Sequence, residues 1–318
     1  MLKKTLVLFA AVMLIAVMFA GCGPKGINSV RINERDITPF NEVRVTTSLS
    51  EIELVESDRY GIDIFVPERF APEWGVENGR LTIRENTSNH IFSGITLRNN
   101  YYVRVYYPAG VEFSDITLLS ASGRIDLPKV SVKDLSIESS SGSVRAAAEA
   151  FGYASIKSSS GSITFSGSGG DVRLESQSGA VQSVTDNCEA IRVTTSSGRA
   201  VVTDKGDAAT ALSVDTQSGS IEVRGGVWQD LTARSSSGST TINGALLGST
   251  FAETASGSVR INVTGSPAEY GYTLTPASGS IHLNGERMSK PALSSGSFDN
   301  HITVTTASGS IRVDFSKN

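Results

Sequence analysis

Apolar and polar residues alternate in a short unit that recurs through most of the chain. Each copy carries a Ser-Gly step, and the glycines stand at positions 123, 142, 161, 179, 198, 219, 238, 257, 279 and 309. The successive spacings are 19, 19, 18, 19, 21, 19, 19, 22 and 30 residues. Apolar residues lie two and four positions after most of these glycines, as in Ile163-Thr164-Phe165, with a polar residue between nearly every pair. This period of two indicates strands with one buried and one exposed face.

The residues before each Gly complete the unit. Further apolar pairs lie five and seven positions before it, and small hydroxyl residues lie three and one before it, as in Ser158 and Ser160. We expect a strand of about eight residues, a bend at Ser-Gly, a strand of about four residues and a corner. We expect Gly at the bend because a turn demands a backbone conformation that β-branched residues resist. Ser160 is expected to face inward, where stacked hydroxyls can satisfy one another and the bend.

A repeat of this length predicts stacked rungs, since a single unit cannot bury its apolar face alone. The predicted fold is all-β: a single-chain parallel β-solenoid with ~19-residue rungs, and we expect a right-handed one. The alternative is an antiparallel sandwich, which also has short, regularly spaced strands. The near-identical repeats favour the solenoid, because each strand of a sandwich has a different environment.

Four regions are expected along the chain: a signal peptide at 1–21, a lipidated Cys and tether at 22–28, an irregular N-terminal β cap at 29–115, and the Ser-Gly repeat solenoid at 116–318. The cap is expected because a solenoid needs an atypical end to cover its first rung. Between Leu283 and Ile302 the repeat is interrupted, which predicts either a protruding loop or a shortened extra rung.

The N-terminus has the features of an export signal. Lys3 and Lys4 precede an apolar run that is short for a membrane span. The run ends in Phe19-Ala20-Gly21-Cys22, which resembles the bacterial lipoprotein signal, with Phe19 where that signal usually has Leu. The alternative is an uncleaved anchor helix. Both place the rest of the chain outside the cytoplasmic membrane, and as a lipoprotein it is expected on the outer membrane or the outer face of the cell membrane.

Composition excludes several function classes. The formal net charge is −4, and removing residues 1–21 with their two lysines makes it −6, so no nucleic-acid partner is predicted. The two cysteines are Cys22 and Cys188. Since lipidation uses Cys22, there is no disulfide framework and no metal-type cysteine spacing, and Cys188 is expected in an inter-strand corner.

The rungs resemble a known bacterial family. The Ser-Ser-Ser-Gly-Ser-Ile repeats follow an N-terminal region containing Gly79-Arg80-Leu81-Thr82-Ile83 and Val103-Arg104-Val105-Tyr106-Tyr107-Pro108-Ala109-Gly110. Together these resemble the "putative adhesin" domains of unknown function, over nearly everything from residue 40 to 318. The resemblance implies a β-solenoid on an extracytoplasmic surface and offers no catalytic residues.

Catalytic and metal-binding patterns are weak. His90, His282 and His301 have no partner at the spacing of a metal site or a triad, and no Gly-x-Ser-x-Gly elbow occurs. Residues 167–171 faintly resemble calcium-binding repeats, with one Asp where a ladder of them is needed. Acids never occupy adjacent rungs in the column after the bend glycines, which disfavours a polysaccharide-cleaving acid pair. We predict no cofactor and no enzyme activity.

The outward column after the bend is therefore the candidate binding surface: Arg145, Thr164, Glu222, Arg260, His282 and Arg312. A long polar face of this kind suits a glycan, peptidoglycan or an envelope protein. Three hypotheses follow: a lipid-anchored adhesin-like binding scaffold, an envelope-stress or regulatory lipoprotein, and a polysaccharide-active enzyme.

Overall fold

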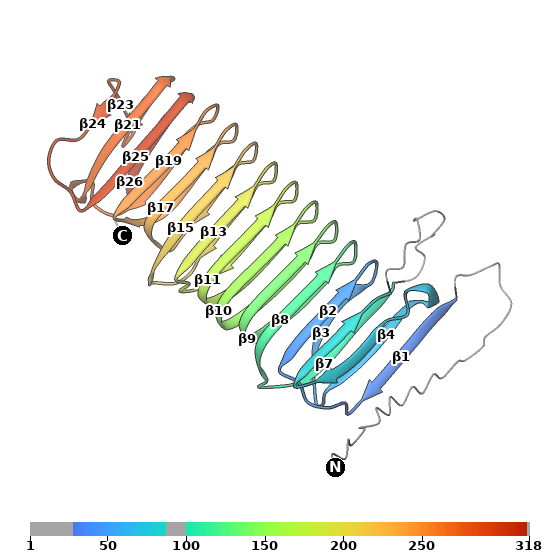
Figure 1. Ribbon diagram of the computed structural model, residues 1–318. Coiled ribbons are helices and arrows are strands. Elements are labelled where there is room, and N and C mark those ends of the chain that lie inside the picture. The colour runs from blue at the N-terminus through green and yellow to red at the C-terminus, as the bar shows by residue number, and fades with distance from the viewer. Residues whose placement is uncertain (1–27, 87–99, 317–318) are drawn as a thin grey trace, which may run out of the picture.

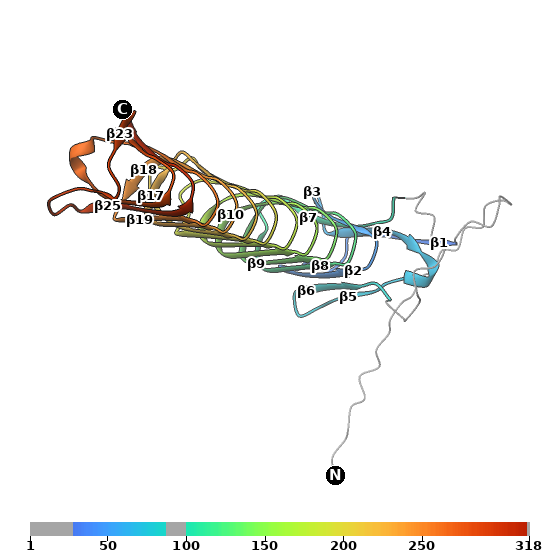
Figure 2. The ribbon, with the colours of Figure 1, turned by 90° about the horizontal axis from the view of Figure 1, so that it is seen from above.

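The chain forms an elongated stack of β-rungs (Figure 1). The computed structural model describes residues 28–86 and 100–316, which contain 26 strands and two short 3-10 turns, η1 (Glu68–Phe70) and η2 (Pro267–Glu269). The strands belong to one hydrogen-bonded sheet that wraps into two layers (Figure 2). The predictions of an all-β fold and parallel rungs are confirmed, while the predicted right hand stays a prediction. The predicted signal peptide, Cys22 and His90 lie outside the described residues.

The leading face contains the strands that precede the bends. In spatial order they are β5 (Glu73–Glu77), β6 (Arg80–Arg84), β2 (Glu42–Thr47), β8 (Glu112–Ser120), the second halves of β9 (Ile125–Ser139), β10 (Val144–Ser158) and β11 (Ile163–Ser176), then β13 (Ala190–Thr195), β15 (Ala209–Thr216), β17 (Val227–Ser235), β19 (Ser249–Thr254), β25 (Asn300–Ser308), β21 (Tyr270–Ser278) and β24 (Ala292–Leu293).

The trailing face contains the strands that follow the bends. In spatial order they are β1 (Ser29–Arg35), β4 (Gly61–Pro67), β7 (Tyr102–Pro108), β3 (Glu51–Ser57), the first halves of β9, β10 and β11, then β12 (Val181–Thr185), β14 (Ala200–Asp204), β16 (Ile221–Arg224), β18 (Thr240–Leu247), β20 (Val259–Thr264), β26 (Ile311–Ser316), β22 (Ile281–Leu283) and β23 (Glu286–Met288). Antiparallel pairs among the described strands occur at the two ends of the stack.

The core forms where equivalent apolar side chains stack between the two faces. Ile163 pairs with Val144 on one side and Val181 on the other, so each inward column continues from rung to rung. Ile163 is 1% exposed and Phe165 is fully buried, whereas Thr164 between them is exposed. The predicted inward and outward assignment of this strand is confirmed. Each fully buried side chain of this size contributes roughly 1.5–3 kcal/mol to stability.

The bend glycines are required by crowding, which differs from the predicted reason. Among the ten, Gly279 alone has a positive φ, of 106°. A Cβ built on Gly161 would lie 2.0 Å from the carbonyl oxygen of Gly142, and one on Gly142 would lie 2.0 Å from that of Gly123. Each bend therefore sits directly on the backbone of the previous bend, and a side chain has no room there.

A column of inward hydroxyls holds the bends. Ser139 Oγ donates to the carbonyl oxygen of Gly142 at 2.8 Å. In a later rung, Thr195 Oγ1 accepts the amide hydrogen of Gly198 at 3.0 Å. The prediction for Ser160 was wrong: it is exposed, and Ser158, three positions before the Gly, is the buried member. The slip of one residue at the bend turns the residue next to Gly outward.

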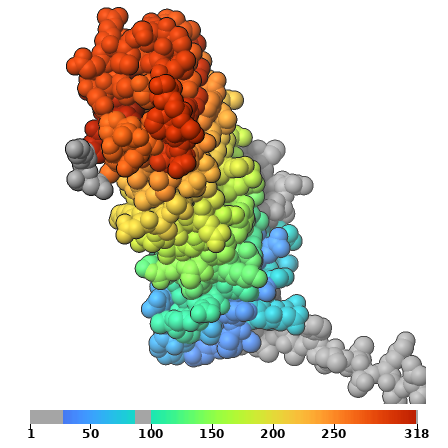
Figure 3. Space-filling view, turned by 90° about the vertical axis from the view of Figure 1, so that its left-hand side faces the viewer, coloured from blue at the N-terminus to red at the C-terminus, as the bar shows by residue number. Residues whose placement is uncertain are grey.

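The rungs at the C-terminal end are out of sequence order. The last segment of the described chain, β25 and β26, lies between the β19–β20 rung and the β21–β22 rung. The segment after Leu283 is neither a free loop nor a full rung: β23 and β24 pair antiparallel with the outermost rung. In Figure 3, where this end faces the viewer, the residues coloured orange to red form one end of the stack.

The N-terminal end shows the same exchange of order. Strands β6 and β7 come later in the chain but lie nearer the N-terminal end of the stack than the β2–β3 rung. On its other side, the β2–β3 rung pairs with β8 and with the start of β9. The same two faces thus run through both predicted regions, 29–115 and 116–318. Glu85 follows β6 in the hydroxyl column and is 1% exposed, and it accepts the Ser48 amide hydrogen at 2.6 Å. Burial raises the pKa of this carboxyl.

Candidate binding surfaces

The predicted outward column lies on the trailing face, as expected. Arg145, Thr164, Arg260 and Arg312 are exposed, and Glu222 and His282 are partly exposed. At the N-terminal end of this column, Arg145 forms an ion pair with Asp126 across adjacent strands at 3.5 Å. Thr164 separates this pair from the rest of the column and lies beside Gln182.

Glu222 is held between two arginines. Arg224 Nε lies 2.6 Å from its carboxylate, and Arg199 contacts the second oxygen. The hydrogen bond from Arg224 is the main reason that the pKa of Glu222 is lowered. A carboxylate stabilised in this way is poorly suited to donate a proton as a general acid.

The structure brings together the last three predicted residues in a new order. Arg260 pairs with Arg312, and Arg312 pairs with His282, on the adjacent strands β20, β26 and β22. The next strand, β23, places Arg287 directly opposite His282. Sequence reasoning missed Arg287, because it lies on an antiparallel strand outside the repeat register.

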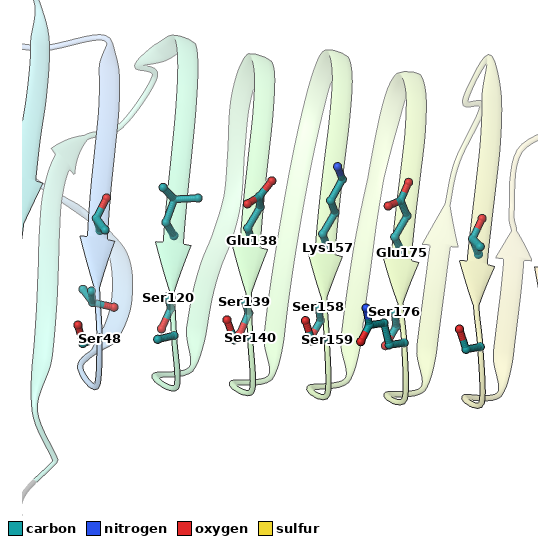
Figure 4. Close-up of a pocket in the computed structure, with 17 residues that line it drawn as sticks. Ser48, Ser120, Glu138, Ser139, Ser140, Lys157, Ser158, Ser159, Glu175 and Ser176 are labelled. Atoms are coloured by element: carbon teal, nitrogen blue, oxygen red, sulfur yellow. The ribbon is translucent and has the colours of Figure 1, made fainter. Parts of the chain in front are cut away.

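A shallow groove on the leading face was not predicted. It is an open depression of about 670 Å³ beside the bends, and it crosses six successive rungs. Figure 4 shows its side chains on the strands of this face. Three columns line it, counted from the bend Gly or from Ser50 at the equivalent position of the β2–β3 rung: the residues four positions before it (Thr46, Leu119, Glu138, Lys157, Glu175, Thr194), the inward hydroxyls, and the residues two positions before it (Ser48, Ala121, Ser140, Ser159, Gln177, Ser196).

The groove combines hydroxyls with alternating charge. Glu138, Lys157 and Glu175 occupy three adjacent rungs in register. Arg173 forms an ion pair with Glu175 from the same strand. Ser140 and Ser159 are exposed in the column nearer the bend. This surface offers hydrogen-bond donors and acceptors at regular steps along the stack. Its lining side chains lie in parallel columns and do not converge on one point, as the groups of a catalytic site do.

The column four residues before Gly carried a signal that could have revealed this groove. Glu138, Lys157 and Glu175 each lie four residues before a bend Gly, so they recur at the repeat spacing. The predicted outward column, three residues after each Gly, recurs in the same way. The column two before Gly forms the second side of the groove, and apart from Gln177 it consists of small residues whose size gave no prediction of a groove.

The remaining candidates for chemistry stay isolated among the described residues. His301 contacts Thr273 at 3.0 Å and His282 contacts Ser280 at 3.4 Å. Cys188 is buried, which raises the pKa of its thiol to about 11 and disfavours the reactive thiolate. Gly167 to Asp171 form the middle of β11. Within residues 28–86 and 100–316, no three His, Cys, Asp or Glu side chains are grouped to hold a metal ion.

The family model described as Toastrack DUF4097 matches residues 40–207 and again residues 169–314. The chain belongs to the Toastrack DUF4097 family. The two matches together span both faces of the stack and confirm the resemblance based on the Ser-Gly rungs. A comparison with curated proteins found no match.

Three solved structures from two species are similar to this Toastrack chain. A "putative adhesin" from Parabacteroides distasonis has 12% identity and a TM-score of 0.45, covering 91% of this chain and 96% of its own. A "putative lipid binding protein" from the same species has 15% identity and a TM-score of 0.43, covering 90% and 96%. A "putative adhesin" from Bacteroides fragilis has 12% identity and a TM-score of 0.36, covering 92% and 98%.

The described part of the chain contains no helix with the length and apolar character needed to cross a bilayer.

Proposed function

We propose that this chain is a non-catalytic binding scaffold outside the cytoplasmic membrane, anchored by lipid on Cys22, and that its leading-face groove binds an extended glycan. The groove is the observation that carries the proposal. It is open along its length and crosses six rungs about 4.8 Å apart, and each rung contributes at least one hydroxyl side chain to the lining. A ligand that matches such a surface is itself long and repetitive.

The side chains favour a polar polymer over an apolar one. Ser140 and Ser159 present hydroxyls, which both donate and accept hydrogen bonds. Lys157 lies between Glu138 and Glu175, so the groove also offers charge of both signs. A peptidoglycan strand, with its hydroxyl, amide and charged groups, has this chemistry, and it lies where a lipid anchor would hold the protein.

Filling the groove tests the binding proposal. Ser159→Trp places a bulky ring in the groove on the leading face. Thr164→Trp places the same ring on the trailing face, away from the groove. We expect Ser159→Trp to weaken co-sedimentation of the full chain with purified peptidoglycan at least about tenfold, since contact along the groove is lost. Thr164→Trp should bind as the natural chain does. Equal binding by all three proteins contradicts the groove as the site.

Anchoring is tested separately. Cys22→Ser removes the thiol that would carry the lipid, so we expect the protein to leave the membrane fraction and to lose metabolic labelling with palmitate. Two acyl chains on one protein are enough for stable membrane attachment, and in this proposal the lipid on Cys22 is the sole membrane anchor. Unchanged membrane attachment without lipid label would contradict the anchor.

A further inference from the structure

Four basic side chains form one row across the C-terminal end of the trailing face. Arg260, Arg312, His282 and Arg287 are partners in register on the adjacent strands β20, β26, β22 and β23. We call them the cationic row. Neighbouring strands are about 4.8 Å apart, so the row repeats a basic group at that step. The row exists because β26 lies between β20 and β22.

Most of the row is available to a ligand. Arg260 and Arg287 are exposed and form no ion pair with the described residues. Arg312 is half exposed and uses Nε to contact Asp314 at 2.5 Å, which leaves its terminal nitrogens outside that contact. His282 Nδ1 lies 3.4 Å from Ser280 Oγ. The row therefore carries uncompensated positive charge at Arg260 and Arg287.

The acids near the row do not neutralise it. Asp314 lies in the neighbouring outward column and is paired with Arg312. Glu286 is the register partner of Leu283, whereas Arg287 is the partner of His282, so the alternation of a strand places Glu286 on the side opposite Arg287. In the row's own column, the nearest acid toward the N-terminus is Glu222, two strands before Arg260, and it is bound by two other arginines.

A column of serines flanks the row on the side of the bends. Ser258, Ser310 and Ser280 come two residues before Arg260, Arg312 and His282. Ser280 Oγ lies 3.2 Å from Ser310 Oγ, so the hydroxyls are themselves stacked at the strand spacing. The strip thus pairs one line of positive charge with one line of hydroxyls.

We propose that the cationic row binds a linear acidic polysaccharide with one carboxylate on each sugar. A guanidinium recognises a carboxylate through two parallel hydrogen bonds, and the serines can bond to the ring hydroxyls of the same sugar. One extended pyranose unit is close in length to the strand spacing of about 4.8 Å, so carboxylates on the side of the chain that faces the row recur at multiples of that spacing. This site is separate from the leading-face groove and does not depend on the function proposed for it.

Two other anionic partners fit the strip less well. Duplex nucleic acid carries one charge per about 1.7 Å of axis, a much denser spacing, and single strands need aromatic rings for stacking, which the row and the serine column lack. Binding to a lipid surface needs apolar side chains that enter it. The exposed Leu293 lies on β24, which belongs to the leading face.

Calorimetric titration of the full chain in detergent with galacturonic acid oligomers tests the proposal. We expect the oligomer to bind, its fully methyl-esterified form not to bind, and added salt to weaken binding. The double variant Arg260→Gln and Arg287→Gln should bind at least about tenfold more weakly. Arg145→Gln, in the same column but paired with Asp126, is the matched control and should bind normally, as should the groove variant Ser159→Trp.

Three results would overturn the proposal. The first is equal binding of the acid and the methyl ester, which shows that carboxylates are not recognised. The second is an equal loss in Arg145→Gln and in the double variant, which shows a general charge effect. The third is binding of phosphatidylglycerol vesicles or RNA through Arg260 and Arg287 without binding of the oligomer. All substituted positions are exposed, and each Arg→Gln change keeps most of the aliphatic part of the side chain, so circular dichroism should show intact rungs.

Discussion

Glycine at each bend sets how closely the rungs can approach. The would-be Cβ of Gly161 meets the carbonyl oxygen of Gly142, which belongs to the backbone and cannot rotate away. The hydroxyl three residues earlier completes the bend by bonding to its backbone. The Ser-Gly step thus combines a small residue for close approach with a polar residue for the backbone groups that the bend leaves unpaired.

Gly161→Ala should lower the free energy of unfolding by about 3 kcal/mol, because a methyl group there forces two bends apart. Gly75 is the control, since a Cβ there has no atom within 4 Å, and Gly75→Ala should change stability by at most about 0.5 kcal/mol. Urea denaturation followed by circular dichroism measures both. Equal stability of the two variants would show that the bends can separate freely.

Neighbouring residues on one strand should respond oppositely to a carboxylate. Ile163→Asp buries an unpaired charge between Val144 and Val181 and should cost about 3–5 kcal/mol. Thr164→Asp, one position on and exposed beside Arg145, should stay within about 0.5 kcal/mol of the natural chain. The same urea measurement decides it, and similar damage from both would contradict the inward and outward assignment.

At the scale of the element, each rung is stable only through its neighbours. The order of rungs along the stack therefore matters more than their order in the chain. Strands β25 and β26 are the last described strands, yet each has a parallel partner on both sides. The shorter β23 and β24 cover the outer edge, where unpaired backbone groups would otherwise be exposed to other chains.

Ending the chain after Asp299 should therefore unfold more than the removed strands. Without β25 and β26, the strands β21 and β22 lose the partners that attach them to the stack, and we expect their amides to lose protection in hydrogen exchange. The amides of β10 and β11, many rungs away, should stay protected. Retained protection in β21 would show that this rung can dock directly on β19.

At the scale of the molecule, the two faces present different chemistry. The leading face carries hydroxyls and alternating charge in a groove near the bends of the rungs from β2 to β13. The trailing face carries the cationic row near its C-terminal end. A rigid stack holds both at fixed positions, so one molecule can contact two polymers at once.

The two surfaces should bind without competition. Saturating the chain with galacturonic acid oligomer should leave its co-sedimentation with peptidoglycan unchanged, because the sites lie on opposite faces and share no residue. Titrating the oligomer into the sedimentation assay measures this. Displacement of the protein by the oligomer would mean that both ligands use one site.

The repeat made much of the fold predictable. Stacked copies share one environment, so the pattern around Gly161 correctly placed Ile163 and Phe165 in the core and Thr164 outside. The same pattern misplaced Ser160, because alternation slips at the bend. Arg145, Glu222 and the other members of the outward column lie on the predicted face, and their role in binding stays a prediction.

The sequence alone was enough for the all-β class, the parallel rungs and the family, because these follow from local alternation and from a period that repeats ten times. The crowding at the bend glycines, the groove over small residues and the row joining Arg260, Arg312, His282 and Arg287 arise from contacts between segments far apart in the chain. Such contacts depend on which rung pairs with which, and because the rungs resemble one another, the local pattern does not reveal that the β25–β26 rung lies between the β19–β20 and β21–β22 rungs.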